Sequence, residues 1–368
     1  MDRFSVNSLL DQLHVHTQLR PEQQVFTFLA DGEQAEASLT FAELNHHARE
    51  IAAHIQATTP KARRALLMHA PGLAFVTALI GCFYAGISAI PCYPPTAKPG
   101  SRSGERFRRI LHDARAELIL TDSGQFSKIL LHHTDNRCRL IDTESLPHGD
   151  EIPPLAATTQ PADIALIQYT SGSTGNPKGV ILRHANLLHN LEAIQMRFGF
   201  TPDSRMVSWL PPYHDMGLIG CILSAVYSGY PVIAMAPRHF LQKPVRWLQA
   251  IQRYQADTSG APNFAYELCA KHIAEPSLQE LDLSCWSLAF CGAEPVRATT
   301  MRRFAQRFAP AGFRATALFP CYGLAEVTLM ATAVSRGTGA KVLTVDRQAL
   351  ARGEAALASE NRDRKSVV

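Results

Sequence analysis

The most informative segment of the sequence is Gln168-Tyr-Thr-Ser-Gly-Ser-Thr-Gly-Asn-Pro-Lys-Gly-Val180, which follows an apolar strand pattern at residues 164–167 and precedes a helical pattern at residues 183–197. It combines glycines, four serine and threonine hydroxyls and a single lysine, Lys178. Glycines let backbone N–H groups approach a ligand closely, hydroxyl groups add hydrogen-bond donors, and a lysine supplies a positive charge for phosphate oxygens. The segment therefore predicts a phosphate-binding loop between a strand and a helix.

Three other interpretations of this segment are weaker. It is not a Walker A loop, because Pro177 precedes Lys178 and Gly179 follows it, so the G-K-[ST] ending is missing. It is not a nucleophile elbow either, since Ser171 takes the place of the first glycine in G-x-S-x-G. A flexible Ser/Gly surface loop has no need of the Pro-Lys-Gly ending. Phosphate binding remains the best interpretation.

Outward from this loop, short apolar segments alternate with helical patterns along most of the chain. Thr40-Phe-Ala-Glu43 has the pattern of a capping box at the start of a helix. Further helical patterns cover residues 183–197 and 244–254. The strand candidates are residues 65–68, 118–120, 164–167, 207–210, 232–234, 287–290 and 317–319. The alternation predicts an α/β fold with helices layered around largely parallel sheets.

One apolar run is long enough to be mistaken for a membrane span. Residues 73–91 carry no charged side chain over about the length that a bilayer requires. Gly86 interrupts the run: apolar residues before it repeat at helical spacing, and the short segment after it is compatible with a strand that ends at Pro91. We therefore expect a buried helix followed by a buried strand, and no membrane span.

Composition excludes several classes of protein. The 368 residues include 46% hydrophobic and 18% charged residues, a globular profile that disfavours disorder and fibrous structure. The net charge of +4 gives no concentrated basic field, so no nucleic-acid partner is expected. The eight cysteines form no C-x-x-C pair, which argues against a zinc site or a disulfide framework. With no secretory signal pattern at the N-terminus, these features predict a cytoplasmic protein.

The loop at residues 169–179 closely resembles the signature loop of the adenylate-forming enzymes, which include acyl-CoA synthetases, firefly luciferase and nonribosomal-peptide adenylation domains. Further motifs of this group follow in the same order: Ser208-Trp-Leu-Pro-Pro-Tyr-His-Asp-Met-Gly-Leu218, Cys291-Gly-Ala-Glu-Pro-Val296 and Pro320-Cys-Tyr-Gly-Leu-Ala-Glu326. Together with Ala89-Ile-Pro-Cys-Tyr-Pro-Pro95, they look most like the fatty acyl-AMP ligase branch. The resemblance implies the N-terminal domain of an adenylate-forming enzyme, built from stacked α/β subdomains.

The resemblance also implies an activity and its cofactors. A ligase of this branch uses ATP and Mg²⁺ to activate a fatty acid as an acyl-adenylate, releases pyrophosphate, and passes the acyl group to an acyl-carrier protein. Because negative charge builds up on phosphate oxygens during this reaction, catalysis depends mostly on positioning and on electrostatic stabilisation.

Residue roles follow from the matched motifs. By resemblance, His214 lies beside the incoming carboxylate, and His214, Lys178 and Glu326 are the catalytic residues. Glu326 is also the expected Mg²⁺ ligand, because carboxylate oxygens suit that ion. The residues expected to bind the phosphates are Thr170, Ser171, Gly172, Ser173, Thr174, Gly175 and Lys178. Those expected around the adenine are Gly292, Ala293, Glu294, Tyr322 and Gly323.

Each of these assignments has a structural alternative. Glu326 could cap a helix or pair with an arginine, and a lone His214-Asp215 pair is more often structural than metal-binding. Tyr322 could belong to the core, as an aromatic residue after a strand usually does. Ala325 stands where many members of the wider family carry a threonine that contacts phosphate, although alanine agrees with the fatty acyl-AMP ligase branch.

Composition also suggests how the chain is divided. The proline-rich residues 145–162 lack periodicity, and the composition changes again after Val334. We expect a first α/β subdomain at residues 1–160, a second at residues 161–335 that carries the phosphate loop and the adenine and Mg²⁺ motifs, and a family-specific insertion or mobile tail that begins at residues 336–368.

The end of the sequence leaves three possibilities open. Lys341-Val-Leu-Thr-Val-Asp-Arg-Gln-Ala-Leu350 resembles the start of the insertion that, in fatty acyl-AMP ligases, is held to disfavour coenzyme A. The family's ribose-binding aspartate, hinge and small lysine-bearing C-terminal domain cannot be located, so a truncated and poorly active ligase domain is expected. The alternatives are an acyl-CoA synthetase of the same fold and a non-catalytic nucleotide-binding module.

Overall fold

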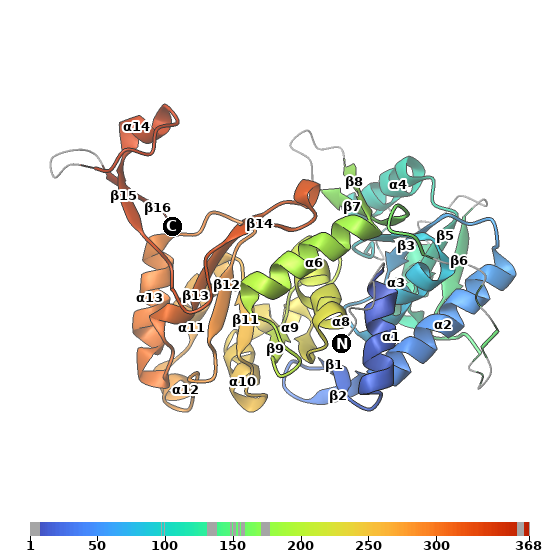
Figure 1. Ribbon diagram of the computed structural model, residues 1–368, viewed down its shortest axis with the longest axis horizontal. Coiled ribbons are helices and arrows are strands. Elements are labelled where there is room, and N and C mark those ends of the chain that lie inside the picture. The colour runs from blue at the N-terminus through green and yellow to red at the C-terminus, as the bar shows by residue number, and fades with distance from the viewer. Residues whose placement is uncertain are drawn as a thin grey trace, which may run out of the picture.

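The structure is a computed structural model. It describes residues 8–96, 98, 100–130, 138–147, 149, 152–153, 155, 159–170, 177–358 and 364–367. Two large sheets and the helices around them account for most of these residues, and Figure 1 shows the sheets at opposite ends of the molecule with helix α6 (His184–Phe198) between them. α6 contacts both sheets, which makes it the element that joins them.

The first sheet has six strands in the order β6-β5-β3-β4-β7-β8. Its strands are β3 (Arg64–Met68), β4 (Ser88–Pro91), β5 (Leu118–Thr121), β6 (Arg139–Asp142), β7 (Ile164–Thr170) and β8 (Lys178–Arg183). Neighbours are parallel except β7 and β8, which form an antiparallel pair. In β3 the side chains alternate between faces: Ala65 and Leu67 join the main core, whereas Leu66 and Met68 join a smaller cluster beneath Phe107. The sheet is therefore buried on both faces, as a parallel sheet requires.

The second sheet has eight strands in the order β14-β13-β12-β11-β9-β10-β1-β2. Its strands are β1 (Gln24–Leu29), β2 (Ala35–Thr40), β9 (Met206–Ser208), β10 (Val232–Met235), β11 (Thr258–Ala261), β12 (Leu288–Cys291), β13 (Leu318–Gly323) and β14 (Met330–Ala333). The central strands are parallel, and only the two outer pairs, β1 with β2 and β13 with β14, are antiparallel. The predicted α/β fold with largely parallel sheets is confirmed.

Helices cover the sheets, and some of them coincide with the helical patterns predicted after Thr40, before Gly86, and at residues 183–197 and 244–254. Besides α6 they are α1 (Leu9–Leu19), α2 (Phe41–Thr58), α3 (Leu73–Ala85), α4 (Arg102–Ala114), α5 (Ser123–Leu130), α7 (Asp215–Gly217), α8 (Ser224–Ser228), α9 (Pro237–Gln242), α10 (Val245–Arg253), α11 (Asn263–His272), α12 (Glu275–Gln279), α13 (Ala298–Phe308) and α14 (Arg347–Ala351). A π-helical turn, Leu218–Leu223, follows α7, and 3₁₀ turns include Ala325–Val327. The predicted capping box is present at α2, where Glu43 N donates to Thr40 Oγ1 at 3.1 Å and Thr40 N to Glu43 Oε2 at 2.8 Å.

The apolar run at residues 73–91 folds as expected. It forms α3 and then β4, and Gly86 between them is the left-handed C-cap at φ 71°. That conformation favours glycine because a side chain would be strained there. None of the helices in the described part of the chain has both the length and the apolar character needed to cross a membrane.

Two features differ from the sequence-based expectations. The phosphate-binding loop was expected to lead directly into a helix, but strand β8 intervenes, so the loop connects the two strands of an antiparallel hairpin before α6 begins. The sheets also do not follow the expected division at residue 160: β1 and β2 belong to the second sheet, whereas β7 and β8 belong to the first. Division of the chain into subdomains at that residue stays a prediction.

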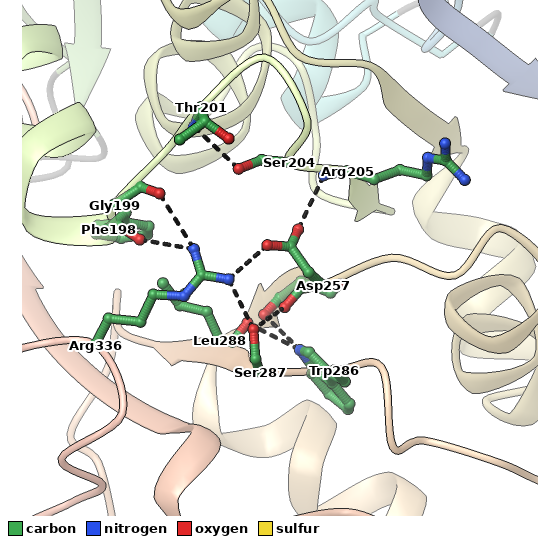
Figure 2. A network of polar contacts seen from close by, with 11 residues as sticks. Phe198, Gly199, Thr201, Ser204, Arg205, Asp257, Trp286, Ser287, Leu288 and Arg336 are labelled. Carbon is green, nitrogen blue, oxygen red and sulfur yellow. Dashed lines mark hydrogen bonds and ion pairs between the residues drawn. The ribbon is translucent and has the colours of Figure 1, made fainter.

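A polar network fixes the chain after β14 to the rest of the fold (Figure 2). Arg336 Nη1 donates to the Phe198 carbonyl at the end of α6 at 3.0 Å, and Nη2 donates to Ser287 Oγ at 2.7 Å and to Asp257 Oδ2 at 2.5 Å. Asp257 Oδ1 in turn accepts from Arg205 N at 2.9 Å. Arg336 thus connects the end of α6 to the residues just before β11 and β12. Through Asp257 it is also linked to the residue just before β9.

Beyond this network the chain forms a small separate sheet. β15 (Leu343–Asp346) pairs antiparallel with β16 (Arg364–Val367), with α14 between them in sequence. Figure 1 shows this unit projecting from the end of the molecule that carries β13 and α13. Its assignment as the start of a family-specific insertion stays a prediction.

Candidate functional site

A cavity of about 400 Å³ opens at the ends of several parallel strands. Thr170 is the last residue of β7, Gly292 follows β12 directly, and Gly323 ends β13. Ligands of open α/β sheets bind at the carboxyl ends of strands, so the location is that expected for a binding site. Seven of the residues predicted from the sequence to take part in catalysis or nucleotide binding line this one cavity: Thr170, His214, Gly292, Ala293, Tyr322, Gly323 and Glu326.

Backbone rather than side chain forms one wall of the cavity. A Cβ atom on Gly292 would lie 3.0 Å from both the carbonyl oxygen and the Sγ of Cys321, so β12 and β13 approach each other closely here. Ala293 has a positive φ of 64°, which turns the chain sharply after the strand. Glu294 does not line this cavity; its Oε1 accepts a hydrogen bond from Phe264 N at 2.5 Å and it borders two neighbouring cavities.

Tyr322 presents its ring to solvent at the edge of the same cavity. The residue is 63% exposed, so the alternative that it packs in the core is wrong. It also lines an adjoining cavity of about 560 Å³ that shares Ala293 and Gly323 with the first. An exposed aromatic face beside a wall of backbone is suited to stacking against a flat heteroaromatic ring.

The turn from Gly323 to Met330 places Glu326 at the cavity. A Cβ atom on Gly323 would lie 1.7 Å from the Leu329 carbonyl oxygen, so only glycine fits where the turn closes. Asn190 of α6 holds the turn from outside: its Oδ1 accepts from Met330 N at 3.0 Å, and its Nδ2 donates to Met330 O at 3.0 Å. The sequence analysis missed Asn190, although an asparagine in the middle of a helical pattern is a signal, because that residue type favours bonds to nearby backbone over helix.

Glu326 is an exposed carboxylate in the 3₁₀ turn Ala325–Val327. Its side chain has no hydrogen-bond or ion-pair partner among the described residues, so it neither caps a helix nor pairs with an arginine there. A free carboxylate at the cavity edge fits a hard cation such as Mg²⁺, which takes one or two protein carboxylates and completes its shell with phosphate oxygens and water.

His214 faces the cavity with a charged partner behind it. Its Nδ1 lies 2.8 Å from Asp215 Oδ1, and the Met216 N–H lies 2.7 Å from that same oxygen but 3.4 Å from His214 Nδ1. These distances favour an Nδ1–H that donates to Asp215, which leaves Nε2 for the cavity. The Asp215 carboxylate raises the pKa of His214 above its ordinary value, against the opposing effect of burial.

The segment that carries His214 is folded tightly. The His214 N–H donates to the Pro211 carbonyl at 3.1 Å, and a Cβ atom on Gly217 would lie 2.3 Å from that same oxygen. Gln168 of β7 fixes the segment to the first sheet, because its Nε2 donates to the Tyr213 carbonyl at 2.9 Å. Trp209 and Leu218, at the two ends of this segment, are buried.

Lys178 lies opposite Thr170 in the register of β7 and β8. It is exposed and is not one of the residues that line the cavity. The predicted phosphate-binding residues Ser171, Gly172, Ser173, Thr174 and Gly175 lie outside the described residues. The structure therefore places the two ends of the loop, Thr170 and Lys178, side by side near the cavity.

A second cavity of about 380 Å³ meets the first at Thr170, His214, Asp215 and Ala325, which line both. Its walls include three tyrosines, and the rings of Tyr93 and Tyr213 meet edge to face with centroids 5.1 Å apart. His214 therefore stands at the junction of two spaces that approach it from different sides.

The chain belongs to the AMP-binding enzyme family, whose model matches residues 14–358. It is 40% identical over 360 residues to the medium-chain-fatty-acid–[acyl-carrier-protein] ligase JamA of Moorena producens, an alignment that covers 95% of this chain and 60% of JamA. It is 34% identical to the putative fatty-acid–CoA ligase FadD21 of Mycobacterium tuberculosis, over 96% of this chain and 62% of that protein.

A solved structure shows the same similarity. The fatty acyl-adenylate ligase from L. pneumophila, in complex with acyl adenylate and pyrophosphate, matches with a TM-score of 0.89 and 40% identity, over 98% of this chain and 62% of that one. The observed fold is thus that of an adenylate-forming enzyme's N-terminal region. The chain spans about 60% of the length of the curated relatives that it matches.

Proposed function

We propose that this chain is the nucleotide- and acyl-binding part of a fatty acyl-AMP ligase. That enzyme uses ATP to convert a fatty acid into an acyl-adenylate, releases pyrophosphate, and delivers the acyl group to an acyl-carrier protein. The observation that carries the proposal is the convergence of seven motif residues, from four separate segments, on one cavity. Similarity to JamA, a medium-chain-fatty-acid–[acyl-carrier-protein] ligase, and to the L. pneumophila fatty acyl-adenylate ligase supports it.

In the proposed reaction a carboxylate oxygen attacks the α-phosphorus of ATP, and the bond to the pyrophosphate oxygen breaks. The Tyr322 ring and the Gly292-Ala293 backbone hold the adenine between them. Thr170, Lys178 and the loop from Ser171 to Gly175 hold the β- and γ-phosphates, with Lys178 as the positive charge. A Mg²⁺ ion held by Glu326 would neutralise charge on the phosphate oxygens.

His214 is proposed to position the reacting carboxylate. With Nδ1–H directed to Asp215, its Nε2 is the atom that faces the cavity, and in the protonated ring it donates a hydrogen bond to a negatively charged oxygen. Because Asp215 raises the pKa of His214, the ring carries its charge at higher pH than an isolated histidine would. That charge offsets negative charge as the reactants come together.

The apolar walls of the cavity are proposed to contact the fatty acyl chain. The cavity is lined by Ile194 and Phe198 of α6 and by Phe290, Leu329 and Met330. An alkyl chain placed against them removes apolar surface from water, which contributes about 25 cal/mol per Å². The polar residues of the same cavity, such as Thr170, His214 and Glu326, would then contact the nucleotide and the reacting carboxylate.

A binding experiment tests the proposal on the chain itself. We expect a non-hydrolysable acyl-adenylate analogue, such as an acyl sulfamoyl adenosine, to bind with one-to-one stoichiometry in calorimetry. Tyr322→Ala should weaken binding by about 10-fold or more, the loss of one stacking contact. Tyr254→Ala, on a tyrosine outside the cavity, is the matched control. Failure of the chain to bind the analogue, or equal effects of both variants, would contradict the proposal.

The second candidate function is an acyl-CoA synthetase of the same fold, which similarity to FadD21, a putative fatty-acid–CoA ligase, favours. The two candidates differ in the acyl acceptor. Protein of the full length of these relatives, given ATP, fatty acid and coenzyme A, should accumulate acyl-AMP if it is an acyl-AMP ligase and acyl-CoA if it is a synthetase. Binding of the analogue without either product would indicate a non-catalytic nucleotide-binding module.

Two further proposals concern organisation and location. We propose that residues 1–160 and 161–335 act as the two subdomains around the cavity, and that residues 336–368 begin the insertion typical of fatty acyl-AMP ligases. A reducing cytoplasm is the proposed compartment, and it is supported by the cysteines: none of the eight, all of which lie in the described part of the chain, forms a disulfide, and six are buried.

A further inference from the structure

Two histidines and a glutamate meet on α2, away from the cavity described above. His46 Nε2 lies 3.5 Å from Glu50 Oε1, and His47 Nδ1 lies 3.1 Å from Glu50 Oε2. The three ligand atoms all lie within 4.8 Å of one another. In Figure 1, α2 lies at the opposite end of the molecule from β12 and β13, so this cluster is separate from the proposed nucleotide site.

The spacing of the three residues follows from the helix. Residues three and four positions apart share one face of an α-helix, so His46 and His47 both reach the side chain of Glu50. In tetrahedral zinc sites the metal–nitrogen and metal–oxygen bonds are about 2.0–2.2 Å long, which places neighbouring ligand atoms roughly 3.3–3.5 Å apart. The two observed nitrogen–oxygen separations lie close to that range, each to a different oxygen of Glu50: 3.5 Å from His46 Nε2 to Oε1 and 3.1 Å from His47 Nδ1 to Oε2.

Glu50 is held in place before any ion binds. Its side chain is only 8% exposed, and its Oε1 also accepts a hydrogen bond from Gly149 N at 3.0 Å. A hydrogen bond from outside the ligand set is what orients carboxylate ligands in metal sites. The two imidazole rings are 41% and 37% exposed, so an ion can reach them from solvent.

We propose that His46, His47 and Glu50 bind a divalent transition-metal ion, with zinc as the expected metal. Two imidazole nitrogens and one carboxylate oxygen suit zinc and its neighbours, whereas calcium and magnesium prefer oxygen ligands throughout. Water would complete the tetrahedral shell. The bound ion would join two neighbouring side chains of α2 to a carboxylate that is anchored at Gly149, and so would stabilise this end of the fold.

Metal titration of the chelator-treated chain tests the site. We expect one equivalent of Zn²⁺ to bind in calorimetry, a rise in Tm on binding, and visible absorption bands when Co²⁺ replaces zinc. His46→Ala, His47→Ala and Glu50→Gln should each weaken zinc binding by about 10- to 100-fold, the range found for changes around metal sites. His189→Ala removes an exposed histidine of α6 and is the matched control.

The outcomes separate the site from adventitious binding by the 15 histidines of the chain. Loss of zinc affinity in the three site variants, with His189→Ala unchanged, supports the proposal. Binding that persists in His46→Ala and His47→Ala, or that falls equally in His189→Ala, overturns it. As a check that does not depend on variants, the imidazole NMR signals of His46 and His47 should shift first as zinc is added to the parent chain; early shifts at other histidines overturn the proposal.

Discussion

Asn190 and Met330 form a reciprocal pair that links α6 to the strand after the Glu326 turn. Asn190 Oδ1 accepts from Met330 N at 3.0 Å, and Asn190 Nδ2 donates to Met330 O at 3.0 Å. The same Nδ2 donates to Val327 O at 3.3 Å. The position of Glu326 at the cavity therefore depends on an amide side chain 136 positions earlier in the sequence, which is itself buried.

We expect Asn190→Ala to loosen this turn. The substitution leaves the Met330 N–H and carbonyl without their side-chain partner, at a cost of about 1–3 kcal/mol in the free energy of unfolding. Calorimetry should also show weaker binding of the acyl-adenylate analogue, because Tyr322 immediately precedes the closed turn and Glu326 lies within it. Met196→Ala, at a residue of the same helix that is 71% exposed, should change neither quantity. Equal analogue affinity in the two variants would count against a positioning role.

Much of this architecture was predictable because local patterns and tertiary packing agree. Some signals are local. The capping box of Thr40 and Glu43 determines where α2 begins, and Gly86 determines where α3 ends before β4. The motif residues of the cavity were predictable for a different reason: their motifs resemble those of adenylate-forming enzymes. The structure brings these motifs together from two sheets, with Thr170 at the end of β7 in the first sheet and the others after β9, after β12 and at the end of β13 in the second.

The rest depends on partners distant in sequence. Strand β8 follows a loop rich in glycine and its burial pattern is mostly exposed, so only its pairing with β7 makes it a strand. The contacts of Asn190 with Met330, and of Arg336 with Asp257, join segments that no periodicity connects. The sequence also did not show that β1 and β2 pair within the second sheet. The proline-rich break at residues 145–162 does not indicate which strands pair.

Asp215 sets the charge of His214, and removing its carboxylate should lower the histidine's pKa. Asp215→Asn keeps an oxygen that accepts from Met216 N but loses the negative charge. We expect the pKa of His214, followed by NMR against a His214→Gln spectrum, to fall to its ordinary value of 6.5 or below, because burial then acts without the opposing charge. Because the pKa of His214 is raised in the folded chain, protonated His214 stabilises the folded chain fully below pH 6.5. That stabilisation is lost as pH rises through the folded-state pKa. Analogue binding should fall over the same range of pH, and at lower pH in the variant; a pKa that does not move would rule out the carboxylate as its cause.

Gly217 is expected to tolerate no side chain. Its φ of −76° is ordinary, so the constraint is purely steric: a Cβ atom would lie 2.3 Å from the Pro211 carbonyl oxygen, which is also the acceptor for the His214 N–H. We expect Gly217→Ala to lower the free energy of unfolding by about 1–3 kcal/mol and to weaken analogue binding through displacement of His214. Gly72→Ala is the control, because its Cβ would meet nothing closer than 4.0 Å. Similar effects of the two substitutions would show that the close approach is not what matters.

Arg336 should be one of the more costly surface arginines to remove. Its guanidinium reaches Asp257, Ser287 and the Phe198 carbonyl at once (Figure 2), and its side chain is 28% exposed. We expect Arg336→Ala to reduce the free energy of unfolding by about 1.5–3 kcal/mol in denaturant titrations. Arg336→Lys should lose less stability than Arg336→Ala but should remain less stable than the parent, since an ammonium group cannot span all three acceptors. Arg352→Ala, which removes an exposed pair with Glu354, should cost less than about 1 kcal/mol.

His69 should make the fold sensitive to acid. It is fully buried, its Nε2 lies 2.9 Å from Thr143 Oγ1, and burial lowers its pKa to about 3. The unfolded chain, with an ordinary histidine pKa near 6.5, therefore takes up a proton before the folded chain does, so stability is complete above 6.5 and is lost as pH falls toward 3. Between pH 7 and pH 5 this histidine alone should account for on the order of 2 kcal/mol.

The measurement is the difference in unfolding free energy between pH 7 and pH 5, from urea titrations of the parent and of His69→Gln. We expect the variant to be less stable at pH 7 but to lose less stability on acidification, because glutamine keeps a polar group near Thr143 and does not titrate. His184, whose pKa burial lowers to about 4, supplies a second contribution of the same sign that persists in the variant. His14→Gln, an exposed change on α1, should leave the parent's pH dependence intact. If His69→Gln loses as much stability between pH 7 and pH 5 as the parent does, the acid sensitivity lies elsewhere in the chain.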